Sequence, residues 1–154
     1  MTRVLSTLLL NPMTLHALIT LQAERLREAL ALLEKLQPDI PEGSPEAEQY
    51  AANIADGRRS LAAREQFLAK LEAAEAALNN YTTHQSKSAL DTLVRSYKAL
   101  FVSQANPLAK QYLDSKPDPT PRLGCGSCRR KLVKQLRAAL TRAHQDDFFV
   151  QNQD

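Results

Sequence analysis

One long amphipathic helix is predicted by the sequence from Pro45 to Leu78, PEAEQYAANIADGRRSLAAREQFLAKLEAAEAAL. Ser44 and Pro45 are a favourable start, because Ser caps free N–H groups and Pro lacks the N–H that a first turn leaves unbonded. Large apolar residues recur at heptad-type spacing, at Ile54, Leu61, Leu68, Leu71 and Leu78. Such a helix is about 50 Å long, more than the roughly 40 Å diameter of a compact chain of this size. Either the helix breaks near Gly57 or the molecule is elongated, and we favour an elongated molecule.

The composition is typical of a helical protein. The 154 residues suggest one domain, and they include four Gly, no Trp and only 5% aromatic residues. Residues with high helix propensity are abundant, and no segment alternates β-branched or aromatic residues with polar ones as a strand does. We therefore predict an all-α fold, an elongated helical bundle built on an antiparallel, coiled-coil-like hairpin.

The bundle is predicted to occupy residues 1–114, with helices at about 12–36, 45–79, 84–105 and 107–114. Asn11-Pro12 and Asn106-Pro107 each resemble an N-cap residue followed by a first-turn proline. Capping-box spacings between Thr82 and Asp91 indicate that the third helix starts in this stretch. The predicted buried faces are Leu15, Leu18, Ile19, Leu26, Ala29, Leu30, Leu33 and Leu36 in the first helix, and Leu90, Leu93, Val94, Tyr97, Leu100 and Phe101 in the third.

Residues 115–124 contain three alternating prolines, Pro117, Pro119 and Pro121. We predict a stiff, extended spacer, because neither a helix nor a central strand tolerates this pattern. The spacer is expected to hold the bundle apart from a module at 125–147, in which a CxxC turn leads into a basic amphipathic helix. The apolar face of that helix comprises Leu132, Val133, Leu136, Ala139, Leu140 and Ala143.

Both ends of the chain carry short apolar segments. Val4–Leu10, VLSTLLL, is expected to pack on the core, to add a helical turn, or to act as an arm that inserts into a partner. The tail at 148–154 is expected to be loose or to use Phe148 and Phe149 as an apolar plug. The seven-residue N-terminal run is short for a signal peptide, and no apolar run spans a membrane. We therefore expect a cytoplasmic protein, or one within a macromolecular particle, that is neither secreted nor membrane-bound.

Cys125 and Cys128 form a CxxC motif at the start of the last predicted helix, and three interpretations are open. A redox site would use the helix N-terminus and adjacent cations to stabilise a thiolate, although the βαβ context of such motifs is missing. A zinc site would need two further ligands, which a second chain could supply in a symmetric Cys₄ arrangement. In the third interpretation, Gly124 and Gly126 shape a tight turn capped by Ser127, and the cysteines pack or form a local disulfide.

Positive charge is concentrated in one segment. Residues 122–145 contain seven Lys and Arg residues and no Asp or Glu, although the net charge of the chain is only +3. Three of these cations occupy the start of the last helix, where the helix dipole disfavours them. Such an arrangement is a receptor for phosphate or carboxylate groups, and a solvated basic face is the alternative. The predicted anion- or partner-binding residues are Arg129, Arg130, Lys131, Lys134, Arg137 and Arg142.

Catalytic motifs are missing from the sequence. It contains no HExxH, no GxSxG and no Gly-rich phosphate loop, so we expect no enzymatic activity. The leading hypothesis is a non-catalytic helical subunit or adaptor of a larger assembly, such as a phage or virion-type particle, that docks onto protein partners or itself through its basic helix and N-terminal arm. The alternatives are a nucleic-acid-binding module, with or without a shared zinc ion, and a thiol redox protein. No cofactor apart from that zinc is expected.

Overall fold

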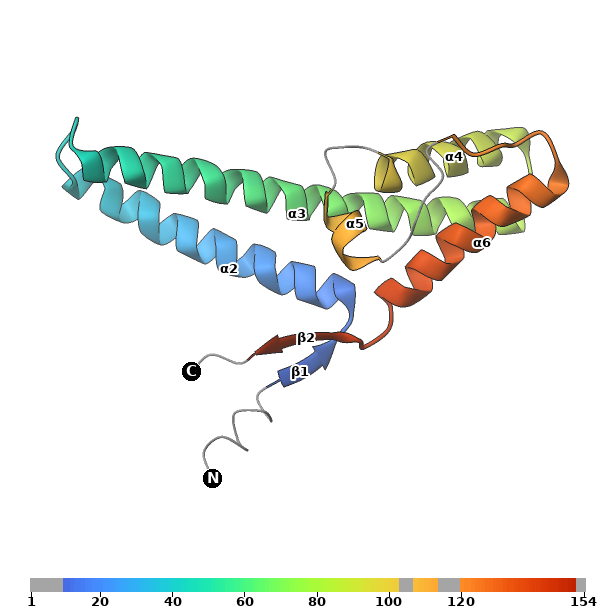
Figure 1. Ribbon diagram of the computed structural model, residues 1–154, viewed down its shortest axis with the longest axis horizontal. Coiled ribbons are helices and arrows are strands. Elements are labelled where there is room, and N and C mark those ends of the chain that lie inside the picture. Colours follow the sequence, from blue (N-terminus) through green and yellow to red (C-terminus); the bar gives the residue numbers. More distant parts are fainter. Residues whose placement is uncertain (1–9, 103–106, 114–119, 152–154) are drawn as a thin grey trace, which may run out of the picture.

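The computed structural model of the chain describes residues 10–102, 107–113 and 120–151. These residues form an all-α fold with one short strand pair, which confirms the predicted fold class. The molecule is elongated along helix α3 (Figure 1). In chain order the elements are β1 (Leu10–Met13), α2 (Leu15–Leu36), the 3-10 helix η1 (Gln37–Asp39), α3 (Pro45–Thr83), α4 (Lys87–Phe101), α5 (Pro107–Tyr112), α6 (Gly126–Ala143) and β2 (Phe148–Gln151).

Helix α3 is continuous through 39 residues and therefore about 58 Å long. The Ser44 hydroxyl caps its start by accepting a hydrogen bond from the Ala47 N–H at 3.2 Å, as its sequence predicts. Gly57 does not break the helix. It allows α2 to approach closely, because a Cβ at this position would lie only 2.8 Å from the Leu30 Cδ2 atom.

Helix α2 packs along the first part of α3, and the two form a hairpin that extends away from the other helices (Figure 1). Ion pairs join the two helices, Arg27 with Glu65 and Arg58 with Glu34, and all four side chains are substantially exposed. Exposed pairs of this kind contribute only about 0–1 kcal/mol each, so the apolar seam holds the hairpin together. On α3 the predicted seam residues are buried or half-buried, namely Ile54, Leu61, Leu68, Leu71 and Leu78.

The main core lies around the second half of α3, where α4, α5 and α6 pack against it. Its largest fully buried side chains include Phe67 of α3, Tyr97 of α4 and Leu136 of α6. The predicted apolar face of α6 is buried in this core except for Val133, which is half-buried. Helix α6 therefore belongs to the same core as the bundle, rather than to a module held apart from it. Residues 115–119 of the predicted spacer lie outside the described residues.

The start of α2 differs from the predicted position. The helix begins at Leu15 rather than at residue 12, and the Thr14 hydroxyl caps it by accepting a hydrogen bond from the Ala17 N–H. Asn11 and Pro12 lie in strand β1 instead. A long-range pairing with β2 holds this segment extended and overrides the local helix-start signal, and Pro is tolerated there because each strand has a free edge.

The third predicted helix, 84–105, is shorter than expected. Helix α4 begins at Lys87, where the Ser86 hydroxyl accepts a hydrogen bond from the Ala89 N–H, and it ends at Phe101. Residues 84–86, predicted as its first residues, instead form the connection after α3, which extends to Thr83. Helix α5 begins at Pro107 as predicted.

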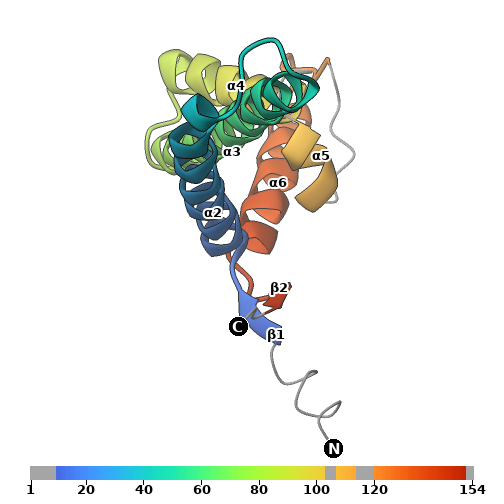
Figure 2. The ribbon, with the colours of Figure 1, turned by 90° about the vertical axis from the view of Figure 1, so that its left-hand side faces the viewer.

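The C-terminal tail forms strand β2, so the expectation of a fold without strands is wrong at this point. It runs antiparallel to β1, with Phe148 opposite Met13, beyond the start of α2 (Figure 2). The Phe148 ring is buried against Tyr112, whose centroid lies 6.0 Å away, whereas Phe149 is 58% exposed. Of the two aromatic residues expected in the tail, only Phe148 therefore packs as a plug. Residues 1–9, which contain most of the predicted N-terminal arm, lie outside the described residues.

Candidate interaction site: the basic groove of helix α6

The sequence of α6 divides the helix into faces of different chemistry. Its apolar residues recur at spacings of three and four and are buried against α3 and α2, at Leu132, Leu136, Ala139, Leu140 and Ala143. The neighbouring stripe, at the same spacings, carries cations and small residues and faces a groove. Because the core face is fixed by burial, the direction of the cationic stripe is fixed as well.

This groove is called the basic groove below. Helix α6 forms one side of it, and the other side is formed by the end of α3 and the loop between α3 and α4. Its volume is about 940 Å³, near the upper end of the range of ligand pockets in proteins. Helix α6 contributes most of the lining, and Tyr81, Thr82 and Gln85 line the opposite side. The α6 residues that line it are Gly126, Arg129, Arg130, Val133, Lys134, Arg137, Ala138, Thr141, Arg142 and Gln145, counting the turn after the helix.

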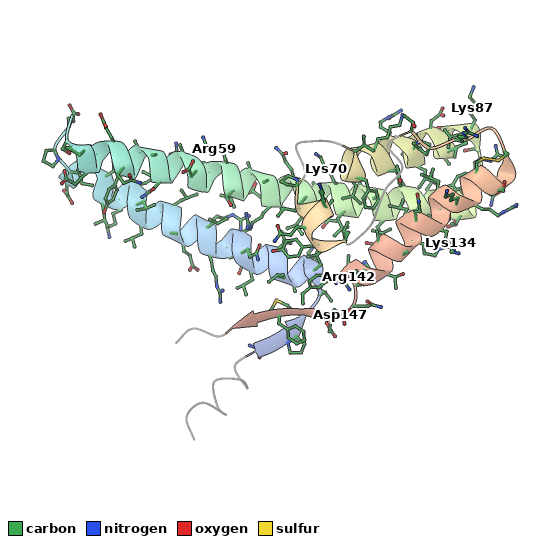
Figure 3. All side chains as sticks on the ribbon, in the orientation of Figure 1. Arg59, Lys70, Lys87, Lys134, Arg142 and Asp147 are labelled. Atoms are coloured by element: carbon green, nitrogen blue, oxygen red, sulfur yellow. A yellow bond between two sulfur atoms is a disulfide. The ribbon has the colours of Figure 1, made fainter. Side chains whose placement is uncertain are left out.

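Five of the six predicted binding residues come together in the basic groove, namely Arg129, Arg130, Lys134, Arg137 and Arg142. Figure 3 shows Lys134 near the middle of α6 and Arg142 near its end, close to Asp147. Lys131 is separate from them. It lines a smaller pocket of about 260 Å³ with Arg122, Cys128 and Gln135, among other residues.

The cations of the basic groove are weakly neutralised by the protein itself. None of the described residues that line it is Asp or Glu. Within the described ranges, Arg142 is the only one of the five cations that forms a salt bridge, to Asp147 at 3.4 Å. The guanidinium of Arg142 also lies 5.3 Å from the centroid of the Phe148 ring. Arg129, Arg130, Lys134 and Arg137 are therefore available to an anionic partner.

The groove also has an apolar part. Tyr81 is only 9% exposed and Val133 is half-buried, while the Ala138 side chain is small and adds no polar group. A surface that combines apolar contacts with unpaired cations suits a partner that presents acidic and apolar side chains together. The sequence reveals the cations of this surface, but not Tyr81, Thr82 and Gln85, because only folding brings the end of α3 beside α6.

The start of α6 is held by the CxxC motif. Cys125 and Cys128 form a disulfide, which is one form of the third interpretation. Cys125 is also the N-cap residue, since its Sγ accepts a hydrogen bond from the Cys128 N–H at 3.1 Å, so the cap is not Ser127 as expected. Among the described glycines only Gly43 has a positive φ, so the expected unusual conformations at Gly124 and Gly126 are wrong.

A metal site depends on the state of these cysteines. Zinc binds cysteine as thiolate, so the predicted shared zinc site concerns the reduced protein and remains a prediction. Among the described residues, no group of three or more His, Cys, Asp or Glu side chains is arranged to hold a metal ion. No helix in the described part of the chain combines the length and apolar character that a membrane span requires.

Comparison of the chain with protein-family models, curated proteins and solved structures found no match. The function is therefore inferred from the fold and the chemistry of the basic groove.

Proposed function

We propose that this protein is a non-catalytic helical interaction subunit that docks an acidic protein surface in its basic groove. The observation that carries this proposal is the collection of five cations along one groove, whose described lining contains no Asp or Glu. Like charges at helical neighbours, such as Arg130 and Lys134, destabilise a helix slightly, and an anionic partner relieves that repulsion. The cations thus contribute more to the bound state than to the free one.

An acidic protein surface is favoured over a nucleic acid by the composition of the groove. Single-stranded nucleic acids bind through exposed aromatic side chains on which bases stack, and each stacked base contributes about 1–3 kcal/mol. Among the described residues that line the groove, Tyr81 is the one aromatic side chain, and it is 9% exposed. Apolar side chains such as Val133 instead suit the apolar part of a protein partner.

Fluorescence anisotropy with two labelled probes of equal charge, a glutamate polymer and a single-stranded DNA, tests the proposal. We expect the glutamate polymer to bind and Lys134→Gln/Arg137→Gln to weaken its binding by about two- to thirty-fold, since each exposed charge pair is worth about 0.2–1 kcal/mol. Both residues are exposed and form no salt bridge within the described ranges, so the variant should fold normally.

The matched control is Arg25→Gln/Arg95→Gln, which removes the same amount of charge. Both residues are exposed, lie inside helices and are outside the basic groove. This control should bind the glutamate polymer as the unmodified protein does. Equal weakening by both variants would mean that binding follows net charge rather than the groove.

DNA binding would favour the alternative function. In that case the DNA probe binds more tightly than the glutamate polymer, and its affinity falls with salt with a slope of about 0.7 per phosphate contacted. Binding of neither probe at low ionic strength would contradict both functions.

A further inference from the structure

The outer end of the α2–α3 hairpin is acidic, although Lys35 lies beside it in the last turn of α2. Residues 37–57 contain five Asp or Glu residues and no Lys or Arg. Asp56 pairs with Arg59, whereas no salt bridge is formed within the described ranges by the other four, which are all exposed: Asp39, Glu42, Glu46 and Glu48. We call this end, residues 36–48, the acidic tip.

The acidic tip also presents apolar surface. The described part of the chain has three large, exposed apolar side chains, and two of them are at this end: Leu36 is the first residue of the tip, and Leu32 lies about one helical turn before it in α2. Leu36 is 40% exposed and Leu32 is 57% exposed. The tip therefore combines acidic and apolar side chains, the combination that suits the basic groove.

The tip and the groove of one chain cannot meet. Pro45, within the tip, begins α3, and Tyr81 lines the groove near the other end of the same uninterrupted helix. The two residues are 36 positions apart, which corresponds to about 54 Å of helix. Figure 1 accordingly shows the tip and helix α6 at opposite ends of the molecule.

We propose that the acidic partner in the basic groove is a second copy of this chain, which inserts the acidic tip of its α2–α3 hairpin. This inference rests on the proposed function and specifies the partner. The four exposed carboxylates of the tip match the four groove cations that have no salt bridge within the described residues, Arg129, Arg130, Lys134 and Arg137. Leu36 then contacts the apolar part of the groove around Val133.

This contact joins two different surfaces, so each bound chain leaves one free groove and one free tip. Head-to-tail contacts of this type build closed rings if the rotation between copies closes, and open filaments if it does not. Because exposed charges dominate the contact, it should weaken with salt. The Debye length falls from about 30 Å at 0.01 M to about 3 Å at 1 M ionic strength.

Sedimentation velocity of the full chain tests the inference. We expect the average mass to rise above the 17.1 kDa monomer with protein concentration at low ionic strength and to return to the monomer at high ionic strength. Two variants should each weaken this contact by about two- to thirty-fold, Asp39→Asn/Glu42→Gln at the tip and Lys134→Gln/Arg137→Gln in the groove. They should therefore stay monomeric at a protein concentration at which the unmodified chain just begins to associate. Arg25→Gln/Arg95→Gln should associate as the unmodified protein does.

A mixture of the two monomeric variants gives the decisive result. The tip variant keeps an intact groove and the groove variant keeps an intact tip, so one strong contact can form between them. We expect a 1:1 dimer and no larger species. A mixture that stays monomeric, or that forms larger oligomers, overturns head-to-tail docking. Circular dichroism of each variant verifies that it is folded.

Failure of this inference is distinguishable from failure of the proposed function. A chain that is monomeric at every concentration and ionic strength, but binds the glutamate polymer in its groove, overturns self-association and leaves the proposed function standing. A chain that neither associates nor binds the polymer contradicts both. Association that Arg25→Gln/Arg95→Gln abolishes as well as the groove variant does also overturns the inference.

Discussion

Substitution of Gly57 by Ala tests the close approach of α2 and α3. In a free helix this change stabilises by about 1 kcal/mol, because Ala has a higher helix propensity than Gly. At this position the new Cβ would lie 2.8 Å from Leu30 Cδ2 and 3.3 Å from Leu30 Cγ, so the Leu30 side chain must shift. Overpacking of this kind typically costs about 1–3 kcal/mol. We therefore expect Gly57→Ala to leave the free energy of unfolding unchanged or to lower it by up to about 2 kcal/mol.

The Leu30→Ala background removes the obstacle. Leu30 is 6% exposed, and truncation of a buried Leu costs about 2–5 kcal/mol. In that background the methyl group that Gly57→Ala introduces has room, and the gain of about 1 kcal/mol from helix propensity should reappear. The two substitutions should therefore be coupled by about 1–3 kcal/mol, the overpacking that Leu30→Ala relieves.

Urea unfolding, monitored by far-UV circular dichroism, measures this coupling in four proteins: the unmodified chain, Gly57→Ala, Leu30→Ala and the double variant. The dependence of the free energy on urea should be similar in all four if the fold is unchanged. If Gly57→Ala stabilises by about 1 kcal/mol in both backgrounds, α2 and α3 are not in contact at Gly57, and the reasoning about the hairpin is wrong.

Three further substitutions and the reduction of the disulfide test the core and the start of α6. In thermal or urea unfolding, Phe148→Ala should lower the free energy of unfolding by about 3 kcal/mol, because the ring is buried against Tyr112 and beneath Arg142. Phe149→Ala should change it by no more than about 0.5 kcal/mol, because Phe149 is 58% exposed. Tyr97→Phe should cost about 0.5–1.5 kcal/mol, since the hydroxyl donates a 3.1 Å hydrogen bond to Gln135 Oε1, and a loss near zero would show that this bond adds nothing. Reduction of the Cys125–Cys128 disulfide should lower the free energy of unfolding by at most about 2 kcal/mol, because the loop that it closes is short. Unfolding with and without reductant measures this difference, and a larger loss would show that the bond does more than fix the turn.

The helices were predictable where local signals agree with burial. Ser44 and Pro45 mark the start of α3, and the apolar spacing of α4 and α6 identifies the residues that are buried in the core. The start of α2 was not predictable in this way. Asn11 and Pro12 have the local signal of a helix start, but their pairing with residues near position 150 holds them extended. No local propensity reports a contact over that separation.

For a similar reason, only one side of the candidate site could be predicted from the sequence. The cations of α6 stand out because residues 122–145 contain no acid, and their spacing puts five of them on one face. The opposite side of the groove is formed by Tyr81, Thr82 and Gln85, which are ordinary residues for the end of a helix. That side exists because the apolar face of α6 must be covered by α3, which also prevents the C-terminal helix from standing apart.

The helix dipole favours the charges of the acidic tip and disfavours those of the basic groove, so the groove charges are the more informative about function. Glu46 and Glu48 lie in the first turn of α3, where the helix dipole favours acids, so part of the charge at the tip stabilises its own helix. Arg129 and Arg130 lie near the start of α6, where the same dipole disfavours cations by about 0.3–1 kcal/mol each. The acidic partner proposed for the groove would offset this cost, because it would neutralise both the helix dipole and the mutual repulsion of these cations.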